Sequence, residues 1–150
     1  MARLVEVYRR LTRPAARRIV AAVPVRPRAA GGLEFLIVRT SNGERWTFPK
    51  GGCERGESPA EAAAREAAEE AGAAGLIGAE PIAEYRYGND LVSAFVLEVE
   101  RDDLPAEAAR DPAWLGFEAA RSRLAAGRPR AFGEQMERVL LAAQRAAGSD

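Results

Sequence analysis

The chain contains no histidine, one cysteine and one lysine among its 150 residues. The absence of histidine excludes Ser-His and Cys-His nucleophilic pairs, and every metal site that needs an imidazole. The single cysteine, Cys53, excludes an intramolecular disulfide framework and a zinc site built from several cysteines. The single lysine is Lys50, and every other basic residue is an arginine.

Long apolar runs and an excess of one charge are missing as well. No segment is long enough to span a bilayer, and the N-terminus lacks the apolar core of a signal peptide. We therefore expect a cytoplasmic protein that makes no use of a membrane. The 22 basic residues balance the 22 acidic residues, so no general attraction to nucleic acid is expected.

The length favours one domain with a single core, which we expect over residues 1–150, with 1–16 as an N-terminal extension and 148–150 as a short tail. Apolar patterns predict strands on both sides of one central helix, followed by two helices. This order excludes an all-parallel sheet and favours an α/β fold with helices on both faces of a mixed sheet. The expected strands are 18–26, 33–39, 79–87 and 91–100, and the expected last helices are 117–126 and 133–147.

The most informative stretch runs from Gly51 to Ala73 and reads GGCERGESPAEAAAREAAEEAGA. Its beginning predicts a glycine-rich turn and the remainder predicts one short helix. Ser58 is a suitable N-cap and Pro59 falls at the first helical position. Gly72 supplies the left-handed residue with which helices commonly end.

Three carboxylates of this helix share one face. Glu66, Glu69 and Glu70 are spaced i, i+3 and i+4, and Arg65 can neutralise only part of their mutual repulsion. Hard divalent cations prefer oxygen ligands, so Mg²⁺ or Mn²⁺ suits such a face. The alternative is a solvated surface helix with a simple i, i+4 ion pair between Glu61 and Arg65.

The complete spacing distinguishes the two interpretations. Five residues separate Gly51 from Glu57, seven follow before Arg65-Glu66, and then come Glu69-Glu70 and Gly72. This pattern resembles the box of the Nudix hydrolases, and the flanking strands extend the resemblance over most of the chain. The resemblance implies an α/β/α sandwich that hydrolyses P–O–P linkages with Mg²⁺ or Mn²⁺. One departure is that Ala67 and Ala73 stand where the box has bulky aliphatic residues.

The resemblance also implies roles for the residues of the box. Glu66, Glu69 and Glu70 would hold the metal together with Gly51, and Glu66 would orient or deprotonate the attacking water. Arg65 would orient the glutamates, whereas Glu57 and Gly72 would be structural. Some members of the family place a further acid, often the general base, outside the box. The candidates for that acid are Glu98, Glu100, Asp102, Asp103 and Glu134.

The residues before the box bear on the substrate. The run WTFPKGG, which contains Lys50, is similar to the Nudix branch that acts on dinucleoside polyphosphates and diphosphoinositol polyphosphates. A compact ammonium suits a bridging phosphate, and arginines at strand ends suit a highly phosphorylated ligand. The candidates for these further contacts are Arg18, Arg39, Arg45 and Arg86. Tyr85 and Tyr87 share one sheet face, where they either stack a base or pack in the core.

Several alternatives stay open. A Nudix enzyme of this kind could instead act on ADP-ribose, nucleoside triphosphates or RNA 5′ ends. A domain that senses a nucleotide without hydrolysing it is another alternative, although an intact set of box acids argues against it. Either a monomer or a homodimer is compatible with the pattern.

Overall fold

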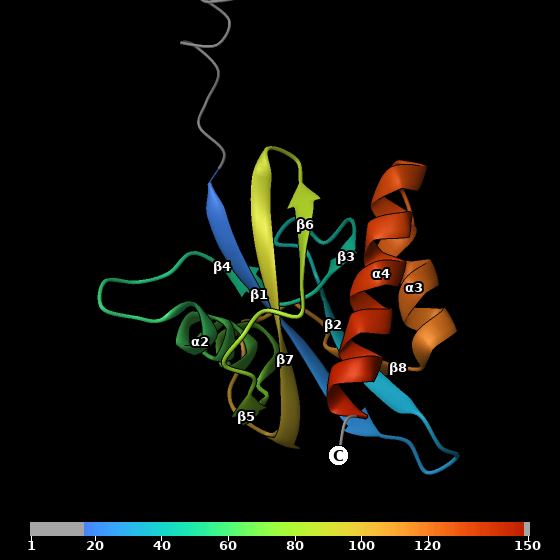
Figure 1. Ribbon diagram of the computed structural model, residues 1–150, viewed down its shortest axis with the longest axis horizontal. Coiled ribbons are helices and arrows are strands. Elements are labelled where there is room, and N and C mark those ends of the chain that lie inside the picture. The colour runs from blue at the N-terminus through green and yellow to red at the C-terminus, as the bar shows by residue number, and fades with distance from the viewer. Residues whose placement is uncertain (1–16, 149–150) are drawn as a thin grey trace, which may run out of the picture.

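The structure is a computed structural model that describes residues 17–148 (Figure 1). The expected extension, 1–16, and the last two residues lie outside this range. Strands β1 (Arg18–Pro27) and β7 (Asp90–Arg101) run parallel through the middle of the molecule. The pairings of the other strands in this range are antiparallel, so the sheet is mixed, as predicted.

The sheet has the strand order β3-β2-β1-β7-β5, and it branches on both sides of its central pair. β4 pairs with β1, β6 pairs with β7, and β8 pairs with β2. The remaining strands are β2 (Leu33–Arg39), β3 (Trp46–Thr47), β4 (Lys50–Gly51), β5 (Ala74–Ile77), β6 (Ala83–Tyr87) and β8 (Ala113–Leu115). The helices are α2 (Pro59–Ala71), α3 (Phe117–Ala125) and α4 (Arg130–Ala147).

Alternation along β1 places a helical layer on each face of the sheet. Ile19, Ala21 and Val23 belong to a core cluster that also contains Leu124 of α3 and Met136 of α4. The intervening residues of β1 belong to a second cluster, which contains alanines of α2. Since successive side chains of a strand point to opposite faces, α2 covers one face while α3 and α4 cover the other (Figure 1). The α/β/α sandwich is therefore confirmed.

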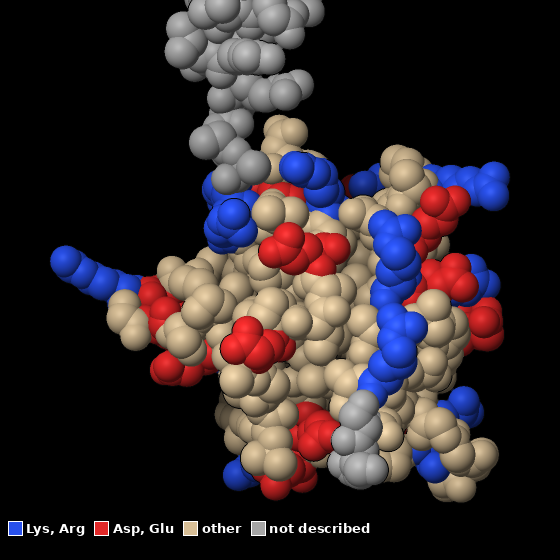
Figure 2. All heavy atoms as spheres, in the orientation of Figure 1, with Lys and Arg blue, Asp and Glu red and all other residues tan. Residues whose placement is uncertain are grey.

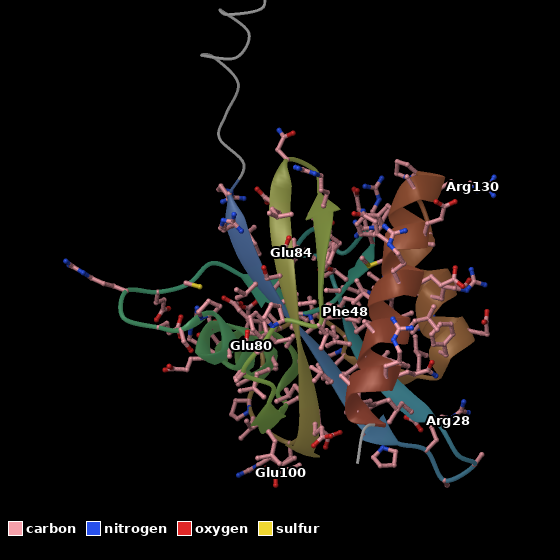
Figure 3. All side chains as sticks on the ribbon, viewed as in Figure 1. Arg28, Phe48, Glu80, Glu84, Glu100 and Arg130 are labelled. Carbon is pink, nitrogen blue, oxygen red and sulfur yellow. The ribbon has the colours of Figure 1, made fainter. Side chains whose placement is uncertain are left out.

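Small side chains let α2 approach the sheet closely. Ala67 and Ala73, the two departures from the box pattern, are both fully buried. Phe48, just before the box, is also fully buried and lies in the interior of the molecule, whereas Glu100 and Arg130 lie at its periphery (Figure 3). The alanines thus change how the helix packs and leave its acids in place.

Four short strands, β3, β4, β5 and β8, were not predicted, and one predicted strand starts later. The expected strand 79–87 is observed as β6 from Ala83, and residues 78–82 form no strand. β5 and β8 have four and three residues, which is too short for apolar alternation to be recognisable. Gly75 also interrupts β5 with a shift of register against β7.

Basic and acidic side chains are mixed on the surface. Figure 2 shows Lys and Arg side chains in a band over α4 and acidic side chains scattered over the rest of that face. Among residues 17–148, no helix is both long enough and apolar enough to cross a membrane.

We expect Gly72→Ala to destabilise the fold by more than about 1 kcal/mol, because Gly72 is left-handed (φ 68°) and an added Cβ would lie 2.5 Å from the carbonyl oxygen of Leu104. Gly43→Ala is the matched control, since Gly43 also has a positive φ (75°) but open space around it. Urea unfolding should give a clearly larger loss for Gly72→Ala. Equal losses would show that the approach of Leu104 is unimportant.

Candidate active site

Helix α2 begins and ends where its sequence predicts. The hydroxyl of Ser58 accepts a hydrogen bond from the backbone N–H of Glu61 at 3.1 Å, and Pro59 occupies the first turn. Gly72 adopts the left-handed conformation, and its N–H bonds back to the last turn of the helix. These caps fix the length of the helix and therefore the face on which its glutamates lie.

Arg65 joins the glycine-rich turn to helix α2. Its Nε and Nη2 donate to the two carboxylate oxygens of Glu57 at 2.7 and 3.0 Å, and Nη2 also donates to the carbonyl of Gly52 at 2.9 Å. Its Nη1 donates to Glu66 at 3.0 Å and to Glu69 at 3.2 Å. The hydrogen bonds from Arg65 lower the pKa of Glu57, and those to Glu57 raise the pKa of Arg65, because each group stabilises the other's charge.

Glu66 and Glu70 meet beside strand β4. Glu70 is only 3% exposed, and its carboxylate oxygens accept from the backbone N–H of Lys50 at 3.4 and 3.5 Å. Burial raises the pKa of Glu70 to about 8; the neighbouring Glu66 carboxylate acts in the same direction, and Arg110 opposes it. The backbone of Gly51 lies so close that an added Cβ would overlap the Glu66 carboxylate.

This pair of acids fits a hard divalent cation. Two carboxylates in contact, one of them buried and biased toward its neutral form, would be relieved of repulsion by a cation between them. In the described part of the chain, no three acidic, histidine or cysteine side chains are grouped as a metal site, and Arg65 bonds Glu69 at the side of the pair. The structure thus brings Glu66 together with Glu70, while Arg65 bonds both Glu66 and Glu69.

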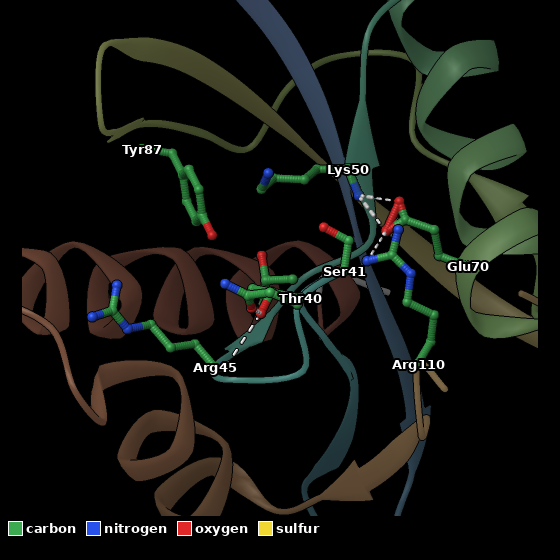
Figure 4. A pocket seen from close by; sticks show the side chains of 9 residues that line it. Thr40, Ser41, Arg45, Lys50, Glu70, Tyr87 and Arg110 are labelled. Carbon is green, nitrogen blue, oxygen red and sulfur yellow. Dashed lines mark hydrogen bonds and ion pairs between the residues drawn. The ribbon is translucent and has the colours of Figure 1, made fainter. Parts of the chain in front are cut away.

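A pocket of about 310 Å³ opens beside Glu70 (Figure 4). Three cationic side chains contribute to its wall, namely Lys50, Arg45 and Arg110, and Glu70 is the one carboxylate among the described residues that line it. Hydroxyls and an amide complete the lining. Guanidinium and ammonium donors grouped in one pocket are suited to phosphate oxygens. The remaining lining residues are Thr40, Ser41, Asn42, Thr47 and Tyr87.

Arg110 is held at the pocket by an unusual backbone. Its neighbours Ala109 (φ 65°) and Asp111 (φ 45°) are the non-glycine residues with positive φ in the described chain. The backbone N–H of Arg39 donates to the Arg110 carbonyl at 2.7 Å, and Arg110 Nη1 donates to the Arg39 carbonyl at 3.2 Å. The same Nη1 lies 3.8 Å from Oε1 of Glu70. Strain of this kind persists only where the surroundings enforce it, and it is concentrated at functional sites.

The predicted phosphate-binding residues are divided by the structure. Lys50 and Arg45 line the pocket beside Glu70. Arg86 lines a neighbouring pocket of about 460 Å³, which shares Arg45 and Tyr87 with the first and also contains Arg128. The other two lie outside both pockets: Arg39 pairs with Asp111, and Arg18 is exposed at the start of β1.

The backbone of Arg86 is fixed by a side chain of helix α4. Its N–H donates to Oε1 of Gln135 at 2.9 Å, and its carbonyl accepts from Nε2 of Gln135 at 3.1 Å. The amide of Gln135 therefore continues the hydrogen bonding of β6 as a neighbouring strand would. This contact fixes the β6–β7 hairpin against α4.

Tyr85 and Tyr87 have different environments. Tyr85 is 3% exposed and packs edge-on against Phe132, and burial raises the pKa of its hydroxyl. It is a core residue, as one of the two predicted alternatives had it. Tyr87 is half-buried and lines both pockets.

The five acids considered outside the box do not line the pocket beside Glu70. Three of them form ion pairs with arginines outside that pocket: Asp102 with Arg26, Asp103 with Arg101, and Glu134 with Arg130. The other two, Glu98 and Glu100, are exposed on β7, and Glu100 lies at the edge of the molecule (Figure 3).

A different acid is near the site. The carboxylate of Glu107 accepts from Nε of Arg110 at 2.9 Å, and its backbone N–H donates to the carbonyl of Glu69 at 2.8 Å. Glu107, Arg110 and Arg128 were not among the predicted site residues. The first two belong to a polar loop without any periodic pattern, and Arg128 follows a turn glycine, so no local signal marked them.

The fold and the site together define an α/β/α domain whose acid-bearing helix borders a cation-lined pocket. The family model described as the NUDIX domain matches residues 16–145, and the chain belongs to this family.

Curated relatives and solved structures resemble the chain over different lengths. Nudix hydrolase 12, mitochondrial, from Arabidopsis thaliana is 37% identical over 97 residues, which cover 55% of this chain and 48% of the relative. Nudix hydrolase 13, mitochondrial, from the same plant is 34% identical over 104 residues, which cover 59% of this chain and 52% of the relative. The chain thus spans about half the length of these relatives.

The solved structures agree in fold. The binary complex of a C. elegans Ap4A hydrolase has a TM-score of 0.66 at 23% identity, with 88% of this chain and 99% of that chain covered. A NUDIX hydrolase from Nitrosomonas europaea has a TM-score of 0.64, also at 23% identity, with 86% and 91% covered. At this level of identity the likeness concerns the fold.

We expect Gly51→Ala to weaken binding of Mn²⁺ by at least about tenfold, because the added Cβ would displace the Glu66 carboxylate. Gly52→Ala is the matched control, since a Cβ there meets nothing within 4 Å. Calorimetric titration with the metal alone measures both variants. Equal affinities of the two variants would contradict a role for the contact between Gly51 and Glu66.

The buried carboxyl of Glu70 predicts a pH dependence of the metal-free protein. A carboxyl whose pKa rises on folding holds its proton more tightly in the folded state. Its contribution to stability is therefore lost as the pH rises from near 4.5 to about 8. We expect Glu70→Gln to gain about 1–3 kcal/mol relative to wild type between pH 5 and pH 9. Urea unfolding in the presence of a chelator measures the free energy of unfolding of both proteins. A difference between them that does not change with pH would contradict the prediction.

Proposed function

We propose that the chain is a Mg²⁺- or Mn²⁺-dependent hydrolase of the P–O–P linkage in a small polyphosphorylated compound. Dinucleoside polyphosphates and diphosphoinositol polyphosphates are the preferred candidates. The observation that carries the proposal is the position of Glu70. It is buried in contact with Glu66 and forms one wall of a pocket whose other charged residues, Lys50, Arg45 and Arg110, are all cationic.

Hydrolysis of a P–O–P linkage requires charge neutralisation and a proton acceptor, and these residues could provide both. Hydrolysis of a pyrophosphate is slow because the anionic phosphates repel the nucleophile and the leaving phosphate carries charge. A divalent cation held by Glu66 and Glu70 would neutralise phosphate oxygens and lower the pKa of a bound water. Glu66 would accept the proton of that water, and Arg65 would keep the glutamates oriented. Lys50 and the pocket arginines would bind phosphate oxygens beyond the cleaved bridge.

Several observations support a substrate with many phosphates. The two neighbouring pockets together present Lys50, Arg45, Arg86, Arg110 and Arg128, more cations than one phosphate requires. The relatives are named Nudix hydrolases, and one structural neighbour is titled an Ap4A hydrolase. The run WTFPKGG favours the same branch. ADP-ribose, nucleoside triphosphates and RNA 5′ ends are the alternative substrates.

A nucleotide sensor without catalysis is the second candidate function. The retained acids Glu66, Glu69 and Glu70 argue against it, because a sensor does not need all three. A cytoplasmic location, and a monomeric or homodimeric state, stay predictions.

The proposal predicts metal-dependent turnover of at least one pyrophosphate compound. Cleavage of dinucleoside polyphosphates, ADP-ribose, nucleoside triphosphates and an inositol pyrophosphate would be followed with and without Mg²⁺ by anion-exchange separation of the products. We expect Glu66→Gln to lower kcat by at least about a hundredfold, because it removes both a metal ligand and the proposed base. Glu118→Gln, which alters an exposed acid paired with Arg121 on α3, should keep full activity.

Binding of one compound without turnover of any would overturn catalysis in favour of the sensor. Equal activity of Glu66→Gln and wild type would remove the box acids from the reaction. The preferred substrate among the four classes would identify the branch.

A further inference from the structure

Lys50 directs its ammonium group away from the acids next to it. Its backbone N–H lies 3.4 and 3.5 Å from the carboxylate oxygens of Glu70, so an ion pair with Glu70 is close at hand. The side chain instead places Nζ 3.9 Å from the centroid of the Tyr87 ring (Figure 4). Among residues 17–148, no carboxylate lies within ion-pair distance of this ammonium.

The same ring holds a second cation. The guanidinium carbon of Arg128 lies 4.9 Å from the Tyr87 centroid and 4.5 Å from that of Phe132. Its Nη2 donates to the Tyr87 hydroxyl at 3.3 Å and to the carbonyl of Trp46 at 3.0 Å, while its Nε is buried and has no hydrogen-bond partner among residues 17–148. Two cations thus rest on one aromatic ring, whose electron-rich face attracts them without neutralising them.

We propose that Tyr87 is a positioning and specificity-determining residue that keeps Lys50 available to phosphate. The idea rests on the proposed function. An ion pair between Lys50 and Glu70 would take the acid from the metal and the ammonium from the substrate at the same time. Tyr87 holds the ammonium at the pocket by a cation–π contact, which keeps Lys50 off Glu70 and leaves the ammonium without a carboxylate partner among residues 17–148.

The contacts of the Tyr87 ring also argue against a role in stacking a base. A ring contacted by Lys50 and Arg128, and edge-on to Phe132 at 5.8 Å, is engaged by its own neighbours and is not a platform for a base. The part of the substrate beside Tyr87 is therefore a phosphate group. A nucleoside adds little to the affinity at this position, and the site recognises the phosphate chain.

The test compares two ligands that share a chain of three phosphates, inorganic tripolyphosphate and ATP. Their affinities would be measured by calorimetry in the presence of Ca²⁺, for wild type, Tyr87→Leu, Tyr87→Phe, Lys50→Met and the double variant Lys50→Met/Tyr87→Leu. We expect Tyr87→Leu to weaken both ligands by the same factor, about threefold to thirtyfold. Tyr87→Phe keeps the ring and should restore most of the affinity.

The double variant separates positioning from a merely structural role. If Tyr87 acts through Lys50, Tyr87→Leu costs less in the Lys50→Met background than in wild type. Additive losses, or a loss confined to ATP, would overturn the proposal, the second because it would mean that the ring stacks a base. Equal affinities of Tyr87→Leu and wild type would overturn it as well. Because binding is measured, these outcomes are independent of turnover, and a protein that binds both ligands but hydrolyses nothing contradicts only the proposed function.

Discussion

The parallel pairing of β1 with β7 is the constraint on which the rest of the structure depends. Both strands change their antiparallel partner along their length: β1 pairs with β4 around Val20 and with β2 from Val25, and β7 pairs with β6 and then with β5. Where β1 accepts β4, the backbone of Lys50 and Gly51 enters the sheet beside helix α2. Glu66, Glu70, Gly51 and Lys50 lie together because β1 pairs with β4 along one part of its length and with β2 along another.

The local parts of this arrangement are readable from sequence. Ser58, Pro59 and Gly72 each fix the backbone through their own chemistry, so the bounds of α2 and the face of its glutamates follow without tertiary information. Arg110 and Arg128 could not be found in the same way. They reach the pockets through a strained loop and through packing on aromatic rings, and both depend on segments distant in sequence. Glu69 also follows from local spacing, because Arg65, expected to orient the glutamates, lies one turn before Glu69 on the helix and donates a hydrogen bond to it.

The site keeps opposite charges close together without letting all of them pair. Arg65 bonds Glu57, Glu66 and Glu69, whereas Glu70 keeps its ion pair with Arg110 at a loose 3.8 Å. The ammonium group of Lys50 contacts the ring of Tyr87. Of these groups, Glu70 is the one whose burial is unfavourable to its charged form, as its raised pKa shows, and a cation bound beside it would relieve that cost.

The amide of Gln135 has a consequence for the molecule as a whole. Within residues 17–148, β6 has β7 as its one neighbour in the sheet, so its other side would present unpaired backbone groups to solvent. By bonding both the N–H and the carbonyl of Arg86, Gln135 occupies the position at which a strand from another molecule could add. One side chain thus blocks the addition of a foreign strand at an edge beside the pocket.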